Sequence, residues 1–245
     1  GKVADVEGYY ENAKINRVYV DRVHVKKAFA EYTAAYNADD TKIKLKIDHT
    51  YRVAALCERI AKAAGMCAYD VELAWLSGML HDVGRFEQIK RYNTFSDADS
   101  VDHAKFGADL LFKDGLISTF LNGMVKCTGY KPGALENRYS SDGVFLYDRL
   151  NKSDMEMLEL AIRCHNMYRI PQGLNSREQA FCNVLRDADK VDIFKVNIDT
   201  PLEEIYNTTT EELMKSDITD EVLEAFDEEH CILKAIRRTP ADTVI

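Results

Sequence analysis

Histidine recurs on the apolar faces of four separate predicted helices, and this feature restricts the fold more than any other in the sequence. The helices are predicted from apolar residues at three- and four-residue spacing. His49, His81, His103 and His165 each fall on the stripe that faces the core. A polar or charged group in an apolar interior costs free energy unless it is paired or coordinates a metal. The sequence therefore predicts an all-α bundle with a polar site in its interior.

The predicted elements follow one another with few breaks. We expect helices over residues 14–37, 46–64, 70–83, 101–113, 116–127, 153–165, from 176 onward, 201–207 and 220–238. Gly84 is read as the glycine that ends the helix carrying His81 and Asp82. Residues 85–100 show no clean periodicity, so we expect a loop beside the site. The segment 114–150 is either an insert that determines specificity or a surface loop.

The length of the chain indicates how many domains to expect, and its net charge limits the kinds of partner it can bind. The chain has 245 residues and no linker-like tract, so one domain is expected: an N-terminal segment 1–45, a core 46–196 and C-terminal helices 197–245. The 32 basic and 41 acidic residues give a net charge of −9, which argues against binding to bulk nucleic acid or to an anionic membrane surface. A local basic pocket for a small substrate remains compatible with this charge.

The cysteine pattern and the hydropathy of the chain indicate in which cellular compartment the protein is expected. Six cysteines are scattered without a C-x-x-C pair, which favours reduced thiols over disulfides or a zinc knuckle. No apolar run reaches the roughly 18 residues of a membrane span, and the N-terminus lacks the layout of a signal peptide. We therefore expect a cytoplasmic protein.

Taken singly, each polar residue in the predicted core has an ordinary explanation. A His-Asp pair at a helix end is usually a polar surface feature, and a lone core histidine such as His49 is usually a satisfied packing residue. Carboxylates change the balance, because Asp187, Asp189 and Asp192 lie among apolar residues of one helix and are costly there without a cation or solvent. Imidazoles and carboxylates gathered from several helices are how helical bundles build di-metal sites.

Four segments in this order resemble the HD-domain superfamily of metal-dependent phosphohydrolases. They read H-T-Y-R-V-A, L-H-D-V-G-R, D-H-A-K-F-G-A and D-A-D-K-V-D, within residues 46–196. The resemblance implies a single-domain helical bundle with an interior metal site. Its implied ligands are His49, His81, Asp82 and Asp189, with His103 and His165 added as in dinuclear members. Asp189 is chosen over Asp187 because the family's ligand follows a small residue, as in A-D-K, and the choice stays open.

The resemblance also implies the chemistry of the site. Asp82 would bridge two divalent metals, with His49, His81 and Asp189 on one and the remaining two histidines on the other. A metal-activated hydroxide would then attack the phosphorus of a phosphomonoester or phosphodiester, a nucleotide being one candidate. Manganese, iron, zinc, nickel, cobalt and magnesium all remain open as the metal.

Some features depart from the HD-GYP branch, which hydrolyses cyclic dinucleotides. Its H-H-E segment is replaced by Cys164, His165 and Asn166, and its G-Y-P segment by the loose stretch 168–171. Leu45 stands where some members of that branch carry a further Glu ligand. These departures argue against cyclic-dinucleotide hydrolysis and against a third metal.

The sequence leaves more than one interpretation open for the residues that contact the substrate and for the reaction. Arg85, Lys105 and Lys190 adjoin predicted ligands in sequence and are either phosphate contacts or solvated surface charges. The same ligands also suit a di-iron oxygenase acting on an organophosphonate or a polyol. A third reading is a ligand-sensing module without activity. The expected partner is a small phosphorylated molecule, and the oligomeric state is open.

Overall fold

The computed structural model describes residues 17–37, 39–121, 125–128, 145–147, 150, 152–199, 201, 208–228 and 232–244. The chain divides into two compact units. The first unit reaches from the N-terminal side to residue 166 and also contains residues 171–189, and the second contains residues 167–170 and 190–245. The three-part division expected from the sequence stays a prediction. The residues predicted to hold metal all belong to the first unit.

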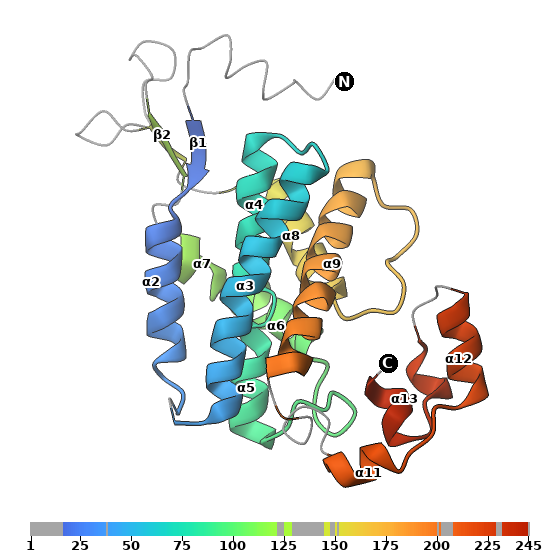
Figure 1. The fold of residues 1–245 in the computed structure, drawn as a ribbon. Coiled ribbons are helices and arrows are strands. Elements are labelled where there is room, and N and C mark those ends of the chain that lie inside the picture. Colours follow the sequence, from blue (N-terminus) through green and yellow to red (C-terminus); the bar gives the residue numbers. More distant parts are fainter. Residues whose placement is uncertain are drawn as a thin grey trace. The chain divides into compact units, whose positions relative to one another are not determined.

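Helices build the first unit, which confirms the all-α prediction (Figure 1). They are α2 (Arg22–Thr33), α3 (Thr41–Ala63), α4 (Ala68–Leu80), α5 (Val83–Tyr92), α6 (His103–Ala108), α7 (Ile117–Leu121), α8 (Lys152–Cys164) and α9 (Ser176–Asp199), with a π-helical turn over Asp109–Lys113. The most extensive contact joins α3 to α4. A Cβ atom on Gly78 would lie only 2.6 Å from the Ala54 Cα, so this glycine allows the two backbones to approach. From Val71 to Leu80 the described side chains of α4 are almost all buried.

A small antiparallel sheet joins the helices and was not predicted. Among the described residues, β1 (Arg17–Val20), β2 (Val125–Thr128) and β3 (Phe145–Tyr147) pair in this order. The expected helices 14–37 and 116–127 are therefore wrong over residues 17–20 and 125–127. Helix α2 begins at Arg22 because the Asp21 carboxylate accepts the His24 backbone N–H at 3.0 Å. The strand β1 pairs with a segment more than 100 residues away, which local periodicity cannot reveal. Residues 129–144, in the predicted insert, lie outside the described residues.

The junction between α4 and α5 differs from its prediction. Helix α4 ends at Leu80, and His81 and Asp82 form the short connection to α5. Gly84 lies inside α5, so it does not end the preceding helix, and the expected loop at 85–100 is helical as far as Tyr92. The physical reason for Gly84 is packing: a Cβ atom there would lie 2.4 Å from the His103 carbonyl oxygen. This close approach brings α6 against the start of α5.

Capping residues explain where the following helices begin. Helix α6 starts at His103 because the Asp102 carboxylate accepts the Lys105 backbone N–H, and not at Val101 after Ser100 as predicted. Helix α9 begins at Ser176, and a reciprocal pair of hydrogen bonds between Asn175 and Glu178 caps its start. There the Asn175 side chain accepts the Glu178 backbone N–H at 3.0 Å, and the Glu178 carboxylate accepts that of Asn175 at 2.9 Å.

The second unit contains short helices after the end of α9. They are α11 (Thr210–Met214), α12 (Asp220–Asp227), a 3-10 turn over Lys234–Ile236 and α13 (Pro240–Val244). The predicted helix 220–238 therefore stops at Asp227, whereas residues 202–207 and His230 lie outside the described residues. The fully buried Asp242 carboxylate accepts the backbone N–H groups of Thr219, Arg238 and Thr239. This carboxylate ties the start of α12 to the start of α13.

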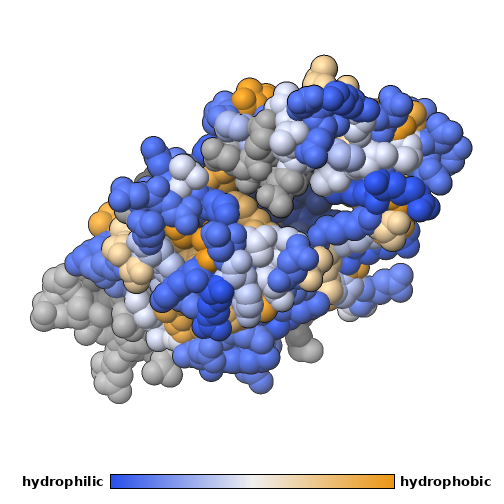
Figure 2. All heavy atoms as spheres, turned by 90° about the horizontal axis from the view of Figure 1, so that it is seen from below, coloured by the Kyte–Doolittle hydropathy of each residue, from blue (hydrophilic) through white to orange (hydrophobic). Residues whose placement is uncertain are grey.

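The hydrophilic surface of the molecule is consistent with a sequence in which 30% of the residues are charged. Hydrophilic residues cover most of the face seen in Figure 2, and apolar residues are scattered among them. None of the helices in the described part of the chain combines the length and the apolar character needed to cross a membrane.

Candidate metal centre

The six residues predicted as metal ligands come together inside the first unit. They are His49 on α3, His81 and Asp82 at the α4–α5 junction, His103 at the start of α6, His165 just after α8, and Asp189 on α9. The four imidazoles and the Asp82 carboxylate are buried. Because these residues come from α3, the α4–α5 junction, α6, the end of α8 and α9, the site depends on the packing of the whole unit.

The Asp82 carboxylate lies between two pairs of imidazoles. Its Oδ2 atom lies 3.6 Å from His49 Nε2 and 3.5 Å from His81 Nε2. Its Oδ1 atom lies 3.6 Å from His103 Nε2 and 3.8 Å from His165 Nε2. Each oxygen of one carboxylate therefore faces its own pair of ring nitrogens.

Asp189 lies on the same side as the first pair. Its Oδ1 atom lies 3.1 Å from His49 Nε2 and 3.7 Å from His81 Nε2. Asp187, the alternative left open by the sequence, is exposed on another face of α9. The geometry therefore favours Asp189. Asp192 is also buried, but it belongs to the second unit.

The ring orientations are fixed by hydrogen bonds at Nδ1. His81 Nδ1 donates to the Gly78 carbonyl and His165 Nδ1 to the Ile162 carbonyl, each at 2.7 Å. A carbonyl oxygen can only accept, so Nδ1 carries the proton and, in the neutral ring, the lone pair is on Nε2. His103 Nδ1 lies 2.7 Å from Asp97 Oδ2, which fixes it in the same way. These are the tautomers that present Nε2 to a metal.

The Nε2 atoms approach one another closely. The distance is 3.3 Å between His49 and His81 and 3.1 Å between His103 and His165. Two lone pairs this close repel each other unless a proton or a cation relieves the repulsion. With two carboxylates beside them, this set of imidazole and carboxylate donors fits divalent metal ions.

The pKa values of Asp82 and His165 favour the protonation states that metal ligands need, whereas burial of His81 is outweighed by Asp82 and Asp189, which raise the pKa of His81. Burial opposes the charge on Asp82, but Lys46 and His81 outweigh it and hold the pKa of this carboxyl well below its usual range. Burial and the neighbouring His103 and His81 lower the pKa of His165 to about 3. Near neutral pH the carboxylate is therefore ionised and His165 is neutral.

Lys46 is a polar neighbour of the site that the sequence analysis missed. Its Nζ atom donates to Asp82 Oδ2 at 2.7 Å. The available signal was its position one turn before His49 on α3, which places both side chains on the same face of the helix.

Asp97 is a second residue that was missed. Besides His103 Nδ1, it accepts Arg85 Nη1 and Gln88 Nε2, each at 3.0 Å, and Asn166 Nδ2 at 3.3 Å. It lies in the segment between α5 and α6, where the sequence shows no periodicity. No pattern in the sequence distinguishes it from the nearby Asp99.

The three residues predicted to contact a phosphate have different surroundings. Arg85 lies beside the centre, with Nε buried, without a hydrogen-bond partner and 3.8 Å from Asp82 Oδ1. The Lys105 side chain is 54% exposed and paired with Asp102 on the surface. Lys190 is exposed and belongs to the second unit. Arg85 is therefore the residue of these three whose contact with a candidate ligand, Asp82, the structure records.

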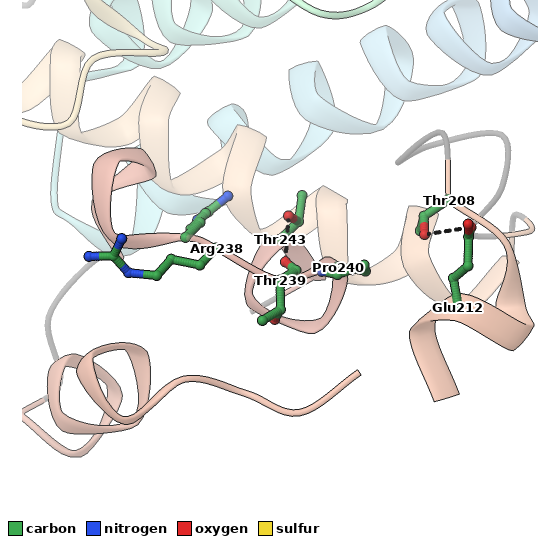
Figure 3. Close-up of a pocket in the computed structure, with 7 residues that line it drawn as sticks. Thr208, Glu212, Arg238, Thr239, Pro240 and Thr243 are labelled. Atoms are coloured by element: carbon green, nitrogen blue, oxygen red, sulfur yellow. Dashed lines mark hydrogen bonds between the residues drawn. The ribbon is translucent and has the colours of Figure 1, made fainter. Parts of the chain in front are cut away.

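The second unit contains a cavity of about 420 Å³ that includes none of the predicted ligands (Figure 3). Its lining residues are Thr208, Glu212, Arg237, Arg238, Thr239, Pro240 and Thr243. The Glu212 carboxylate in this cavity already caps α11 by accepting the Thr209 backbone N–H. We assign no function to the cavity.

Comparisons with known proteins agree with this geometry. The family model described as HD domain matches residues 47–239 of the chain. HD domains generally bind divalent metals, and two groups here have donor atoms close enough to hold one: His49, His81 and Asp82, and Asp82, His103 and His165. No curated protein sequence matches the chain.

Among solved structures, the chain is similar to a predicted HD superfamily hydrolase from an uncultured Thermotogales bacterium. The two chains are 21% identical, with 69% of this chain and 68% of that chain covered and a TM-score of 0.42. The family match itself extends over most of this sequence and includes all six converging residues. The chain therefore belongs to the HD domain family.

Proposed function

We propose that the protein is a metal-dependent phosphohydrolase with two divalent ions at the Asp82 centre. One observation carries the proposal: each oxygen of the buried Asp82 carboxylate faces a separate pair of Nε2 atoms. A carboxylate in this position is suited to bridge two ions. Membership of the HD domain family supports a metal-dependent hydrolase. The phosphoester substrate and the dinuclear state are our proposals.

The side chains divide into two ligand groups in this proposal. His49, His81, Asp189 and Asp82 Oδ2 would hold one ion, and His103, His165 and Asp82 Oδ1 the other. Bound divalent ions polarise phosphoryl oxygens and lower the pKa of water. The set contains imidazole and carboxylate donors without a thiolate, which leaves manganese, iron, zinc, nickel, cobalt and magnesium as candidates.

The chain itself contributes position and charge. The carbonyl oxygens of Gly78 and Ile162 hold the His81 and His165 rings with Nε2 toward the centre. The unpartnered Arg85 Nε is a donor for a phosphoryl oxygen beside Asp82. With one arginine and one lysine at the centre and a chain charge of −9, the substrate we propose is a small phosphomonoester or phosphodiester, such as a nucleotide. We propose no nucleic-acid or membrane partner.

Substitution at the bridging carboxylate tests this function. The purified protein is loaded with Mn²⁺ and assayed with p-nitrophenyl phosphate, bis-p-nitrophenyl phosphate and a panel of nucleotides. We expect the wild-type protein to release phosphate or nitrophenol, and Asp82→Ala to lose bound metal and hydrolysis together. Asp187→Asn is the matched control, because it removes an exposed carboxylate from α9 and keeps both properties. Unchanged turnover in Asp82→Ala would refute the assignment.

A further inference from the structure

The Lys46 ammonium lies next to Asp82 Oδ2. In the proposed function, the same oxygen binds a divalent metal ion. The Lys46 side chain is 14% exposed, and Nζ lies 2.7 Å from Asp82 Oδ2. The same ammonium lies 5.4 Å from the centre of the Phe95 ring. Lys44, two residues earlier on α3, is exposed to solvent. On helix α3, Lys46 is therefore directed into the centre, whereas Lys44 lies in solvent.

The pairing of Lys46 with Asp82 cannot be its complete role if the site binds two divalent ions. In that state Asp82 Oδ2 contributes to an ion, and an ammonium on the same oxygen is repelled by that ion. The side chain is mostly buried, so water alone solvates the ammonium poorly. An additional anionic partner next to Asp82 would relieve the repulsion and satisfy the remaining donors.

Arg85 shows where that anion would bind. Its Nε is buried, unpartnered and 3.8 Å from Asp82 Oδ1, whereas Lys46 is on the Oδ2 side. The Arg85 guanidinium lies 5.7 Å from the centre of the same Phe95 ring that Lys46 contacts. Phe95 thus lines the space beside both cations. Two donors on the two sides of one carboxylate suit a ligand with several charged oxygens, as in a phosphoryl group.

We propose that Lys46 is a substrate-positioning residue whose ammonium binds a phosphoryl oxygen, with Arg85 Nε on a second oxygen. This inference rests on the proposed function. It transfers to Lys46 the role that the sequence suggested for Lys105 and Lys190. The Lys46 ammonium binds the negatively charged phosphoryl group and is not a metal ligand. Its removal therefore weakens binding of the phosphoryl group and leaves metal loading unchanged.

The test compares Lys46→Met with Lys44→Met. Both variants remove one ammonium from α3, but only the first removes it from the centre. Metal content is measured by elemental analysis after loading with Mn²⁺, and binding of inorganic phosphate to the loaded proteins by titration calorimetry. We expect both variants to retain the metal content of the wild-type protein. Lys46→Met should weaken phosphate binding by about 10- to 100-fold, the usual effect of losing a hydrogen bond to a charged group.

Turnover gives a second, independent readout. With a phosphomonoester substrate, Lys46→Met should raise KM by a similar factor and change kcat less, and Lys46→Arg should recover part of the loss. Lys44→Met should match the wild-type protein in every measurement. Wild-type phosphate affinity in Lys46→Met, or loss of metal from this variant, would overturn the inference.

Failure of the proposed function has a different signature. In that case the metal-loaded wild-type protein hydrolyses no phosphoester, whatever the variants do. The phosphate titration does not depend on turnover, so it decides the role of Lys46 separately. A wild-type protein that binds no phosphate would also overturn the inference.

Discussion

Asp97 Oδ2 lies 2.7 Å from His103 Nδ1 and holds the opposite ring nitrogen toward Asp82. Burial opposes the charge on Asp97, yet the hydrogen bond from His103 and the charges of His103 and Arg85 lower the pKa of this carboxyl well below its usual range. A carboxylate on the far nitrogen of a metal-binding imidazole orients the ring and increases its basicity. The segment between α5 and α6 thereby orients one residue of the candidate metal centre.

Asp97→Asn should weaken binding of the ion that we propose at His103 by about 10- to 100-fold, because His103 loses a charged acceptor. Titration of the metal-free protein with Mn²⁺ measures this affinity. Asp99→Asn is the control, since Asp99 is exposed in the same segment. Equal affinities for wild type and Asp97→Asn would show that the contact does not tune the site.

Gly84→Ala should disturb the site through the backbone. The added Cβ would lie 2.4 Å from the His103 carbonyl oxygen and 2.7 Å from the Gly107 nitrogen, so α5 and α6 would have to separate. Overpacking of this kind costs about 1–3 kcal/mol. Gly107→Ala is the graded comparison, because its Cβ would meet its nearest atom at 3.0 Å. Urea unfolding and metal titration should rank Gly84→Ala as the more damaging change, and the reverse order would contradict this packing.

Arg177 connects α9, which carries Asp189, to α4 and α8. Its guanidinium lies 2.6 Å from Asp70 Oδ1 and 2.7 Å from Asp154 Oδ1. Arg177→Met leaves the buried Asp154 without this countercharge. A fully buried pair broken in this way costs about 3–5 kcal/mol, and with 35% of the arginine side chain exposed we expect about 2 kcal/mol.

Fluorescence of Trp75 can follow the unfolding of Arg177→Met, because the chain has one tryptophan and it is buried in α4. Arg59→Met provides a control for loss of an exposed arginine. Adding Asp154→Asn to Arg177→Met should recover part of the lost free energy of unfolding. No recovery in this double variant would indicate that the buried charge is not the cause.

Asp242 should make the second unit sensitive to acid. Burial raises the pKa of this carboxyl, but bonds from the backbone N–H groups of Thr219, Arg238 and Thr239 outweigh it and lower the pKa to about 2. A lowered folded-state pKa stabilises the unit above the usual value of about 3.9, and this stability is lost as the pH falls from there toward the folded-state value. The loss is measured as the decrease, between pH 5 and pH 2, in the protection of the Thr219 and Thr239 amides against hydrogen exchange, relative to the intrinsic exchange rate at each pH.

The matched variant for the acid experiment is Asp242→Asn. Its Thr219 and Thr239 amides should be less protected than those of the wild type at pH 5, and their protection should change less between pH 5 and pH 2. An unchanged pH dependence in this variant would assign the acid sensitivity to other carboxylates.

The burial of the candidate histidines could be predicted from helical periodicity, whereas the six-residue ligand set is what the family resemblance implies. His49 shares a stripe with Val53, and His165 ends the stripe of α8, so their burial is visible locally. The choice between Asp187 and Asp189 needed the family resemblance, and the structure places them on different faces of α9. For His49 and His165, the local helical pattern contains the necessary information.

Other features depend on contacts between distant segments. Gly84 looked like the end of a helix, because a glycine that permits close packing against His103 has the same local signature as one that ends a helix. Strand β1 pairs with β2 far along the chain. The bond from Lys46 to Asp82 joins residues 36 positions apart, and no short motif includes both.

The most direct test of the central claim is the number of metal ions that the protein binds. Elemental analysis of the purified protein, after loading with Mn²⁺ and removal of free ions, should give two ions per chain for the wild type. It should give fewer for Asp82→Ala and two for the exposed control Asp187→Asn. A wild-type protein that saturates at one ion or none, or an Asp82→Ala variant that keeps two, would contradict the bridged centre.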